Sequence, residues 1–205
     1  MGLWSTHVVP RVVDVALGRP EIRALRAEVC AGLSGRVLEL GAGSGPNLPL
    51  LPTDVAALDV VEPSDVAWAR SAARRAEASV PVTRIGLDGQ RIAAPDASYD
   101  AVLCTFALCT IPDPAAALGE AVRLLRPGGR LHLLEHGAHP DSRIARWQAR
   151  LDPWQQRLVD GCHLTREPFD LVRAAGLRVV EEHARDLGPG PGRVVGHLRW
   201  GLAAR

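Results

Sequence analysis

A short apolar segment that runs directly into a glycine-rich loop constrains this chain more than any other feature. Residues 36–40 are Arg-Val-Leu-Glu-Leu, and residues 41–45 are Gly-Ala-Gly-Ser-Gly. Glycines allow sharp turns and let a backbone approach a ligand closely, and such a loop after a strand is typical of α/β proteins with a ligand site at the carboxyl edge of the sheet. The sequence therefore predicts a strand at 36–40, a ligand-binding loop, and a helix that starts near Asn47.

Apolar strands alternate with helices along most of the chain. Further strands are predicted at 55–61, 80–85, 99–105 and 130–135, with helices at 8–17, 21–33, 65–78 and 114–125. After them come a helical segment at 141–161, a helix from Thr165, and strands at 177–182 and 193–202 joined by the Gly/Pro-rich turn 188–192. This alternation indicates an α/β fold, a parallel sheet covered on both faces and closed by an antiparallel hairpin. We expect one domain over residues 1–205, in which helices within 1–34 cap the site.

Composition excludes several classes of protein and of chemistry. Hydrophobic residues make up 47% and charged residues 23% of the chain, which is typical of globular proteins. The net charge of +1 lacks the basic excess that nucleic-acid binding usually requires, so no nucleic-acid partner is expected. All 24 basic residues are arginine, and the absence of lysine excludes a Walker-type phosphate loop, a kinase lysine and a pyridoxal phosphate Schiff base.

Four cysteines are scattered along the chain without a CxxC pair, and no signal peptide opens it. We therefore expect reduced thiols in a cytoplasmic protein and no metal site. The longest apolar run, 101–111, is far shorter than the ~18–20 residues of a transmembrane helix, so no integral membrane segment is expected. Cys109 and Cys162 are expected to act as small packing residues. Trp147 and Trp154, seven residues apart on one helix face, are expected in the core, with an acceptor pocket or a membrane surface as the alternatives.

The spacing of the loop glycines favours one kind of ligand over another. A dinucleotide fingerprint is GxGxxG, whereas this loop is GxGxG and has Pro46 at the place of the third dinucleotide glycine. Glu39, before the loop, suits a ligand with amine and sulfonium groups better than a pyrophosphate. Glu62 ends the second strand, where its carboxylate can accept hydrogen bonds from ribose hydroxyls, and Asp88 after the third strand can accept from an adenine amino group. Together these residues outline a pocket for S-adenosylmethionine.

The chain resembles the class I S-adenosylmethionine-dependent methyltransferases. Residues 38–45 resemble the first motif of that family, Glu62 its ribose-binding acid, and residues 124–129, Leu-Leu-Arg-Pro-Gly-Gly, the turn before its fifth strand. The resemblance implies a Rossmann-like, mostly parallel seven-stranded sheet of order 3-2-1-4-5-7-6 with an N-terminal helical lid. It also implies cofactor contacts from Glu39, Gly41, Ala42, Gly43, Gly45, Asn47, Glu62, Pro63, Asp88, Gly89, Thr105 and Phe106.

A narrower resemblance is carried by segments 108–111 (Leu-Cys-Thr-Ile), 134–136 (Leu-Glu-His), 151–153 (Leu-Asp-Pro) and 160–167 (Asp-Gly-Cys-His-Leu-Thr-Arg-Glu). They are similar to the methyltransferase-like thiol S-methyltransferases, which methylate small alkyl thiols in animals. The chain departs from the animal members in having Ala42 where a cysteine is common and in lacking their N-terminal hydrophobic anchor. The resemblance implies a small-molecule thiol as the methyl acceptor, while peripheral contact with a membrane stays open.

A thiol acceptor needs a group that raises its thiolate fraction. His136 is the first candidate for that base, because residues at strand ends face the methyl group in this architecture. Asp160 and His163 come next, and His7 could fold over the site. The alternatives are N-, O- or C-methylation of a lipid amine, a quinone precursor or a secondary metabolite, and a cofactor-binding protein without turnover. A nucleotide-dependent oxidoreductase is opposed by Pro46 and by the absence of a Tyr-x-x-x-Lys pair.

Overall fold

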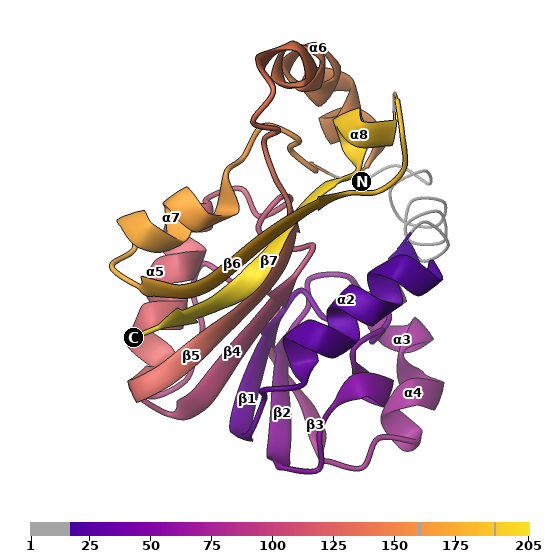
Figure 1. The fold of residues 1–205 in the computed structure, drawn as a ribbon. Helices are drawn as coiled ribbons and strands as arrows, with labels where there is room; N and C mark the ends of the chain where they lie inside the picture. Colours follow the sequence, from indigo (N-terminus) through magenta and orange to yellow (C-terminus); the bar gives the residue numbers. More distant parts are fainter. Residues whose placement is uncertain (1–16, 160, 191) are drawn as a thin grey trace.

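Seven strands form one mixed sheet of order β3-β2-β1-β4-β5-β7-β6, as the resemblance implied. The computed structural model describes residues 17–159, 161–190 and 192–205 (Figure 1). The strands are β1 (Gly35–Leu40), β2 (Val55–Val61), β3 (Val82–Gly86), β4 (Tyr99–Thr105), β5 (Leu125–His136), β6 (Arg178–Asp186) and β7 (His197–Ala204). The helices are α2 (Pro20–Cys30), η2 (Leu48–Leu50), α3 (Asp65–Arg70), α4 (Ala72–Ala76), α5 (Pro114–Leu124), α6 (Ser142–Leu158), α7 (Pro168–Ala174) and α8 (Gly192–Val195).

The order in which successive strands are added to the sheet reverses at its centre, between β1 and β4. β1 pairs in parallel with both β2 and β4, and β4 pairs in parallel with β5. β7 is antiparallel to both of its neighbours, β5 and β6, as the predicted closing hairpin requires. The crossover from β3 to β4 places a switch point between β1 and β4, and ligands of open α/β sheets bind outside the carboxyl ends of the strands at such a point.

Helices cover both faces of the sheet, because the central strands are apolar on both sides. One buried cluster joins β4 and β5 to α5 and α7, which lie together in Figure 1. The other joins β1 and β2 to α2 on the opposite face. β4 is buried along almost its whole length, as expected for a central parallel strand.

Two of the predicted helices differ from the structure. The helix expected near Asn47 is only the 3-10 turn η2, because Pro52 lacks the backbone N–H that a longer helix would need at that position. The helix predicted at 65–78 is broken into α3 and α4 at Ser71, whose hydroxyl donates to the Trp68 carbonyl at 2.7 Å. Such back-bonding by serine bends or interrupts helices.

The second half of the chain contains three corrections to the predicted elements. The turn predicted at Pro127–Gly129 is a bulge within β5, where the register with β4 shifts. The predicted helix from Thr165 begins at Pro168, where proline occupies the first turn. Gly192–Val195 form the short helix α8 rather than the start of a strand, so β7 begins only at His197. The helix predicted at 8–17 lies outside the described residues except at its last position.

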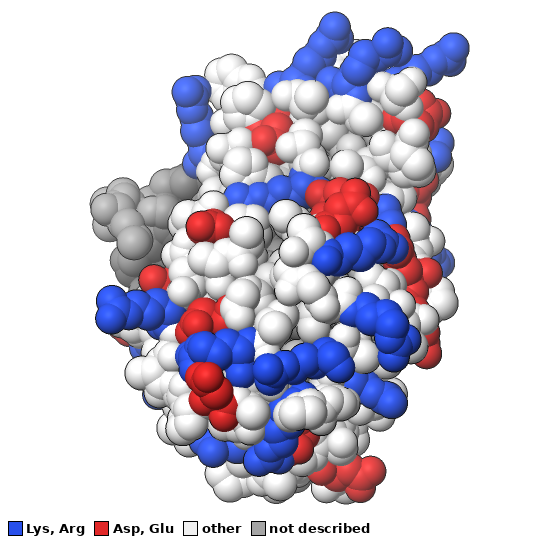
Figure 2. Space-filling view, turned by 90° about the vertical axis from the view of Figure 1, so that its left-hand side faces the viewer, with Lys and Arg blue, Asp and Glu red and all other residues white. Residues whose placement is uncertain are grey.

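The expectation that Trp147 and Trp154 lie in the core is wrong. Both are exposed on α6, at 54% and 62%. Leu151 and Leu158 are exposed on the same helix, spaced to share one face with the tryptophans. Arginine side chains of α6 also project at the top of the molecule in Figure 2. None of the helices in the described residues has the length and apolarity that crossing a bilayer requires. Contact of this face with a membrane surface stays a prediction.

Candidate active site

The loop after β1 depends on glycine for two separate reasons. Gly41 has φ of +70°, and a Cβ there would lie 2.6 Å from the Ala107 Cβ, so a side chain would clash with the loop after β4. Gly43 has φ of +57°, and a Cβ there would meet nothing within 4 Å. A side chain at Gly43 would therefore project into open space above the sheet edge. Gly41 permits the packing, whereas Gly43 leaves room for a ligand.

Two adjoining cavities open at this edge and share Gly41, Gly43 and Phe106 as lining residues. The larger, of about 450 Å³, lies over the ends of β2 and β3, and the smaller, of about 160 Å³, lies toward α2. Nine of the predicted cofactor contacts line one or both cavities: Gly41, Ala42, Gly43, Glu62, Pro63, Asp88, Gly89, Thr105 and Phe106. The other three, Glu39, Gly45 and Asn47, do not line them.

Glu62 is buried at the end of β2 and is already tied to the glycine loop. Its Oε2 accepts from the Gly43 N–H at 2.6 Å, and its Oε1 accepts from the Ser64 N–H at 2.8 Å. These two hydrogen bonds hold the Glu62 carboxylate rigidly, and Glu62 lines the larger cavity. Asp88, in contrast, is exposed, and hydrogen bonds from Gln90 lower its pKa.

A buried polar network lies behind the smaller cavity. The Asn47 amide donates to Glu39 Oε1 at 2.6 Å and contacts Thr105 Oγ1 at 2.9 Å. Arg26 donates to Asn47 Oδ1 at 2.8 Å and to Thr105 Oγ1 at 2.7 Å. Among the described residues the Oε2 of Glu39 has no hydrogen-bond partner. Burial raises the pKa of Glu39 to about 7, although the Asn47 amide and the Arg26 charge oppose that rise. Glu39 and Asn47 therefore support the cavity from behind.

Sequence reasoning missed both arginines that line the smaller cavity. Arg26 comes from α2, and Arg74 comes from α4, where it donates to the Ser44 carbonyl at 2.7 Å. Neither belongs to a motif, and each reaches the loop from a distant part of the sequence. Two guanidinium groups at one end of the site suit a ligand carboxylate.

Phe106 connects the cofactor side of the site with His136. Phe106 has φ of +56°, which is strained for a residue with a side chain, and its N–H donates to the Leu134 carbonyl at 2.8 Å. Its ring meets the His136 ring edge-on, with centroids 5.1 Å apart. His136 ends β5 and is half-buried. His136 therefore lies next to a residue that lines both cavities, although its own side chain lines neither of them.

The loop after Phe106 is held by a carboxylate that sequence reasoning passed over. Glu135 is buried and accepts from the backbone N–H groups of Ala107, Leu108 and Cys109 at 2.7, 2.9 and 3.3 Å. Arg166 donates to the Leu108 and Ile111 carbonyls on the other side of that loop. Segment 161–167 thus packs directly on the loop.

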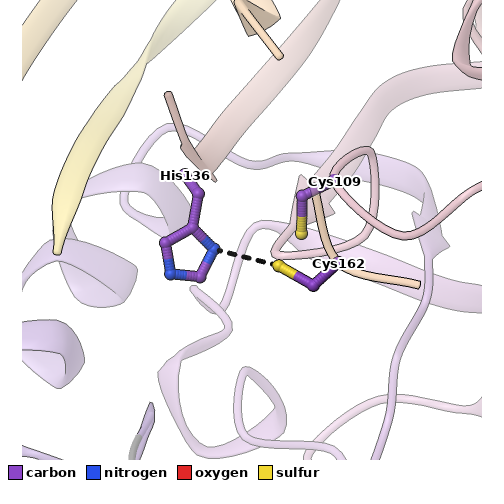
Figure 3. A group of neighbouring side chains, drawn as sticks. All are labelled: Cys109, His136 and Cys162. Atoms are coloured by element: carbon purple, nitrogen blue, oxygen red, sulfur yellow. Dashed lines mark hydrogen bonds between the residues drawn. The ribbon is translucent and has the colours of Figure 1, made fainter. Parts of the chain in front are cut away.

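The two cysteines of these segments face each other and His136 (Figure 3). Cys162 Sγ lies 3.9 Å from His136 Nδ1, and the two sulfur atoms and this nitrogen all lie within 4.8 Å of one another. Both cysteines are buried, as expected of packing residues, and the fold in addition brings them together with His136. Contact with Cys109, and next with His136, lowers the pKa of Cys162, while the same contact and burial raise the pKa of Cys109.

His163, the third predicted catalytic residue, points elsewhere. Its backbone N–H donates to the Cys109 carbonyl at 2.8 Å, but its Nδ1 lies 3.2 Å from Asp152 Oδ2 on α6. Its side chain lines neither cavity. The His163 side chain is therefore paired with Asp152 and does not lie beside His136. Asp160 and His7 lie outside the described residues.

Comparisons with known proteins agree with this geometry. Residues 18–182 match the model of a family described as "Methyltransferase domain". A solved S-adenosylmethionine-dependent methyltransferase of Leishmania major matches with a TM-score of 0.71 at 20% identity, covering 98% of this chain and 80% of that one. At this identity the likeness shows the fold alone.

Two curated relatives differ in the acceptor that their names give. The human thiol S-methyltransferase TMT1B is 38% identical over 151 residues, which are 70% of this chain and 61% of that protein. A demethylmenaquinone methyltransferase of Deinococcus radiodurans is 34% identical over 129 residues, 61% of this chain and 53% of that protein. This chain thus spans about three fifths of the thiol methyltransferase's length.

Proposed function

The chain belongs to the class I S-adenosylmethionine-dependent methyltransferases, and we propose that it methylates the sulfur of a small-molecule thiol. The observation that carries this proposal is the position of His136, whose ring meets Phe106 at the boundary of both cofactor cavities. Support for a thiol as the acceptor comes from the similarity to thiol S-methyltransferases.

The residues that line the two cavities fit S-adenosylmethionine. The rigid Glu62 carboxylate suits ribose hydroxyls at the larger cavity. Arg26 and Arg74 suit the carboxylate of the amino-acid part at the smaller one, and the unpartnered oxygen of Glu39 supplies negative charge behind it. Gly43, between the cavities, leaves space where a Cβ would project. Bound there, S-adenosylmethionine supplies a methyl group on a sulfonium, which a nucleophile displaces in line.

The chain itself would orient the acceptor, exclude water and promote the thiolate. An alkyl thiol has a pKa of ~8.5, so a modest base or a nearby cation is enough to raise its thiolate fraction at neutral pH. His136 is the residue at the cavity boundary that can do this, and its other ring nitrogen points away from the cysteines in Figure 3. Phe106, Ala107 and Ile111 give the larger cavity an apolar wall, which disfavours water beside a bound acceptor.

An acceptor screen tests the proposal. The purified protein is incubated with S-adenosylmethionine and, in separate reactions, an alkyl thiol, a lipid amine and a phenolic quinone precursor, and the products are identified by mass spectrometry. We expect S-methyl products from the thiol alone. N-, O- or C-methyl products would instead favour the alternative that the Deinococcus relative represents. Binding of S-adenosylmethionine without any methylated product would indicate a binding protein without turnover.

Replacement of Glu62 by alanine is expected to weaken S-adenosylmethionine binding by about 1–3 kcal/mol, since the ribose hydroxyls and the Gly43 N–H both lose their acceptor. Calorimetric titration measures the change. The matched control is Glu120→Ala, because Glu120 also accepts a backbone N–H, from Ile92 at 2.8 Å, but lies on α5 away from the cavities. Equal affinity in the Glu62 variant and the wild type would exclude a contact with the cofactor.

The affinity for S-adenosylmethionine is expected to rise as the pH rises toward 7, by at most about tenfold per unit, and to level off above pH 7. Burial raises the pKa of Glu39 to about 7, so this carboxyl is protonated in the free protein below that pH, and a cationic ligand favours its ionised form. The free protein also loses stability as the pH rises through 7, because the folded state holds this proton more tightly than the unfolded chain.

Calorimetry in buffers of different ionisation enthalpy measures the proton released on binding. Glu39→Gln keeps the shape of the side chain and its contact with Asn47 but cannot titrate, so its affinity is expected to vary little over this range. If the affinity of Glu39→Gln depended on pH as that of the wild type does, the titrating group would be a residue other than Glu39.

A further inference from the structure

Three distant segments of the chain bring metal-ligating atoms to one point. Cys109 lies on the loop after β4, His136 ends β5, and Cys162 lies between α6 and α7 (Figure 3). Each comes from a segment that the sequence analysis singled out for its resemblance to thiol methyltransferases. The family fold needs none of the three for cofactor binding, since none of them lines a cofactor cavity.

The separations of these atoms approach those of a tetrahedral zinc site. With Zn–S of ~2.3 Å and Zn–N of ~2.0 Å, tetrahedral ligand atoms lie ~3.6–3.8 Å apart. Cys162 Sγ and His136 Nδ1 are 3.9 Å apart, and all three atoms lie within 4.8 Å of one another. Small rotations of the two cysteine side chains would therefore complete the geometry.

Charge and support also suit a zinc ion. Two thiolates and one neutral imidazole balance the charge of Zn²⁺, so the occupied site would bury no net charge. The backbone around the ligands is fixed: the Cys109 N–H donates to Glu135, the Cys109 carbonyl accepts from the His163 N–H, and the Cys162 N–H donates to the Val159 carbonyl. Such outer contacts hold metal ligands in place.

A second group of possible ligands in the described chain is less suitable. His139, Asp186 and His197 also lie close together. Arg193, however, donates to Asp186 at 2.6 Å and contacts His139 Nε2 at 3.3 Å. A guanidinium group therefore already supplies the positive charge at that second group.

We propose that Cys109, His136 and Cys162 bind a zinc ion with three protein ligands and leave its fourth position for the sulfur of the methyl acceptor. Three-ligand zinc sites are typical of catalytic rather than structural zinc. The cysteines are buried and His136 is half-exposed, so access to the fourth position is from the His136 side, next to Phe106.

The role of the metal in methyl transfer rests on the proposed function. On coordination, the acceptor thiol loses its proton to solvent, because zinc deprotonates coordinated thiols. The sulfur then forms a bond to the methyl carbon with its own electron pair. The bond from that carbon to the sulfonium sulfur breaks, and its electron pair stays on the cofactor sulfur. In this reaction His136 acts as a ligand, and the metal takes the place of a free base.

The experiment first measures metal binding without reference to activity. The full chain is expressed with zinc in the medium, and its metal content is determined by mass spectrometry, with about one zinc ion per chain expected. Apoprotein is then titrated with Co²⁺, whose thiolate charge-transfer absorption reports cysteine ligands. Cys109→Ala and Cys162→Ala are expected to lose the zinc and this absorption. Cys30→Ala is the matched control, because Cys30 is an equally buried free cysteine on α2, and it is expected to keep both.

S-adenosylmethionine binding by calorimetry verifies that each variant is folded. Retention of zinc by Cys162→Ala, failure of the folded wild type to take up Zn²⁺ or Co²⁺, or a Cys109–Cys162 disulfide in the purified protein would each overturn the site. Removal of zinc is expected to lower thiol turnover at least tenfold, with recovery on readdition. Full turnover of metal-free protein would overturn the role of the metal while leaving the proposed function intact. Zinc binding without thiol turnover would reject the proposed function and leave the site.

Discussion

Replacement of Gly43 by valine is expected to abolish measurable binding of S-adenosylmethionine. The side chain would project from the loop into the space that both cavities share, since a Cβ at Gly43 meets no protein atom within 4 Å. The φ of +57° is in addition strongly unfavourable for a β-branched residue, so the loop would shift and move the N–H that Glu62 accepts. Calorimetric titration of wild type and variant measures the loss.

The variant Gly128→Val distinguishes obstruction of the ligand space from backbone strain. Gly128 lies in the bulge of β5 with φ of +80°, and a Cβ there also meets nothing within 4 Å, but the residue lines neither cavity. This control therefore carries comparable backbone strain without obstructing the ligand. We expect it to lower the melting temperature and keep the affinity. Gly43→Ala is expected to fall between wild type and Gly43→Val. If Gly43→Val bound S-adenosylmethionine as tightly as the wild type, the cofactor could not lie between these two cavities.

The sheet could be predicted from the sequence because its signals are local. Each central strand is a short apolar run, and the glycines of residues 41–45 follow one of them directly. The carboxyl ends of parallel strands meet at one edge, so the positions of Glu62 and Asp88 after their strands were enough to place both at the same cavity. The strand order itself came from the resemblance, which the structure confirms.

The residues that sequence reasoning missed act through contacts between distant segments. Arg26 reaches Thr105, which is 79 positions further along the chain, and no spacing rule predicts that contact. The sequence predicts a packing role for the two cysteines because neither has a neighbour at metal-ligand spacing along the chain, yet folding brings them together with His136. The spacing of Trp147 and Trp154 shows that they share one helix face, but it does not show whether that face points to the core or to solvent. In the structure it points to solvent.

Local polar contacts account for the incorrect helix boundaries. The Ser71 hydroxyl competes for a helix carbonyl and divides the predicted helix into α3 and α4. Thr165 is a residue type that often caps helices. The chain at this point is instead held against the loop after β4, because Arg166 donates to the Leu108 and Ile111 carbonyls of that loop. The helix can begin only after this tertiary contact, at Pro168.

Replacement of His136 by alanine is expected to lower thiol turnover by about 10²–10⁴-fold while leaving the affinity for S-adenosylmethionine unchanged. The ring meets Phe106 at the cavity boundary but does not line either cavity, so its loss removes thiol activation and not a cofactor contact. Steady-state kinetics with an alkyl thiol gives the turnover, and calorimetry gives the affinity. His183→Ala is the control, because His183 stacks on Trp200 in the closing hairpin, with ring centroids 5.4 Å apart.

Comparison of an alkyl thiol with an aromatic thiol as acceptors then tests whether His136→Ala loses turnover because the thiolate no longer forms. An aromatic thiol is more acidic than an alkyl thiol and is already largely ionised at neutral pH, so the turnover ratio of wild type to His136→Ala is expected to be much smaller for it. An equal ratio for both acceptors would assign His136 to positioning, and normal turnover of the alkyl thiol would remove it from the reaction. The zinc content of the same variant decides how the residue acts: loss of zinc makes His136 a ligand that activates the thiol through the metal, whereas retained zinc makes it the base itself.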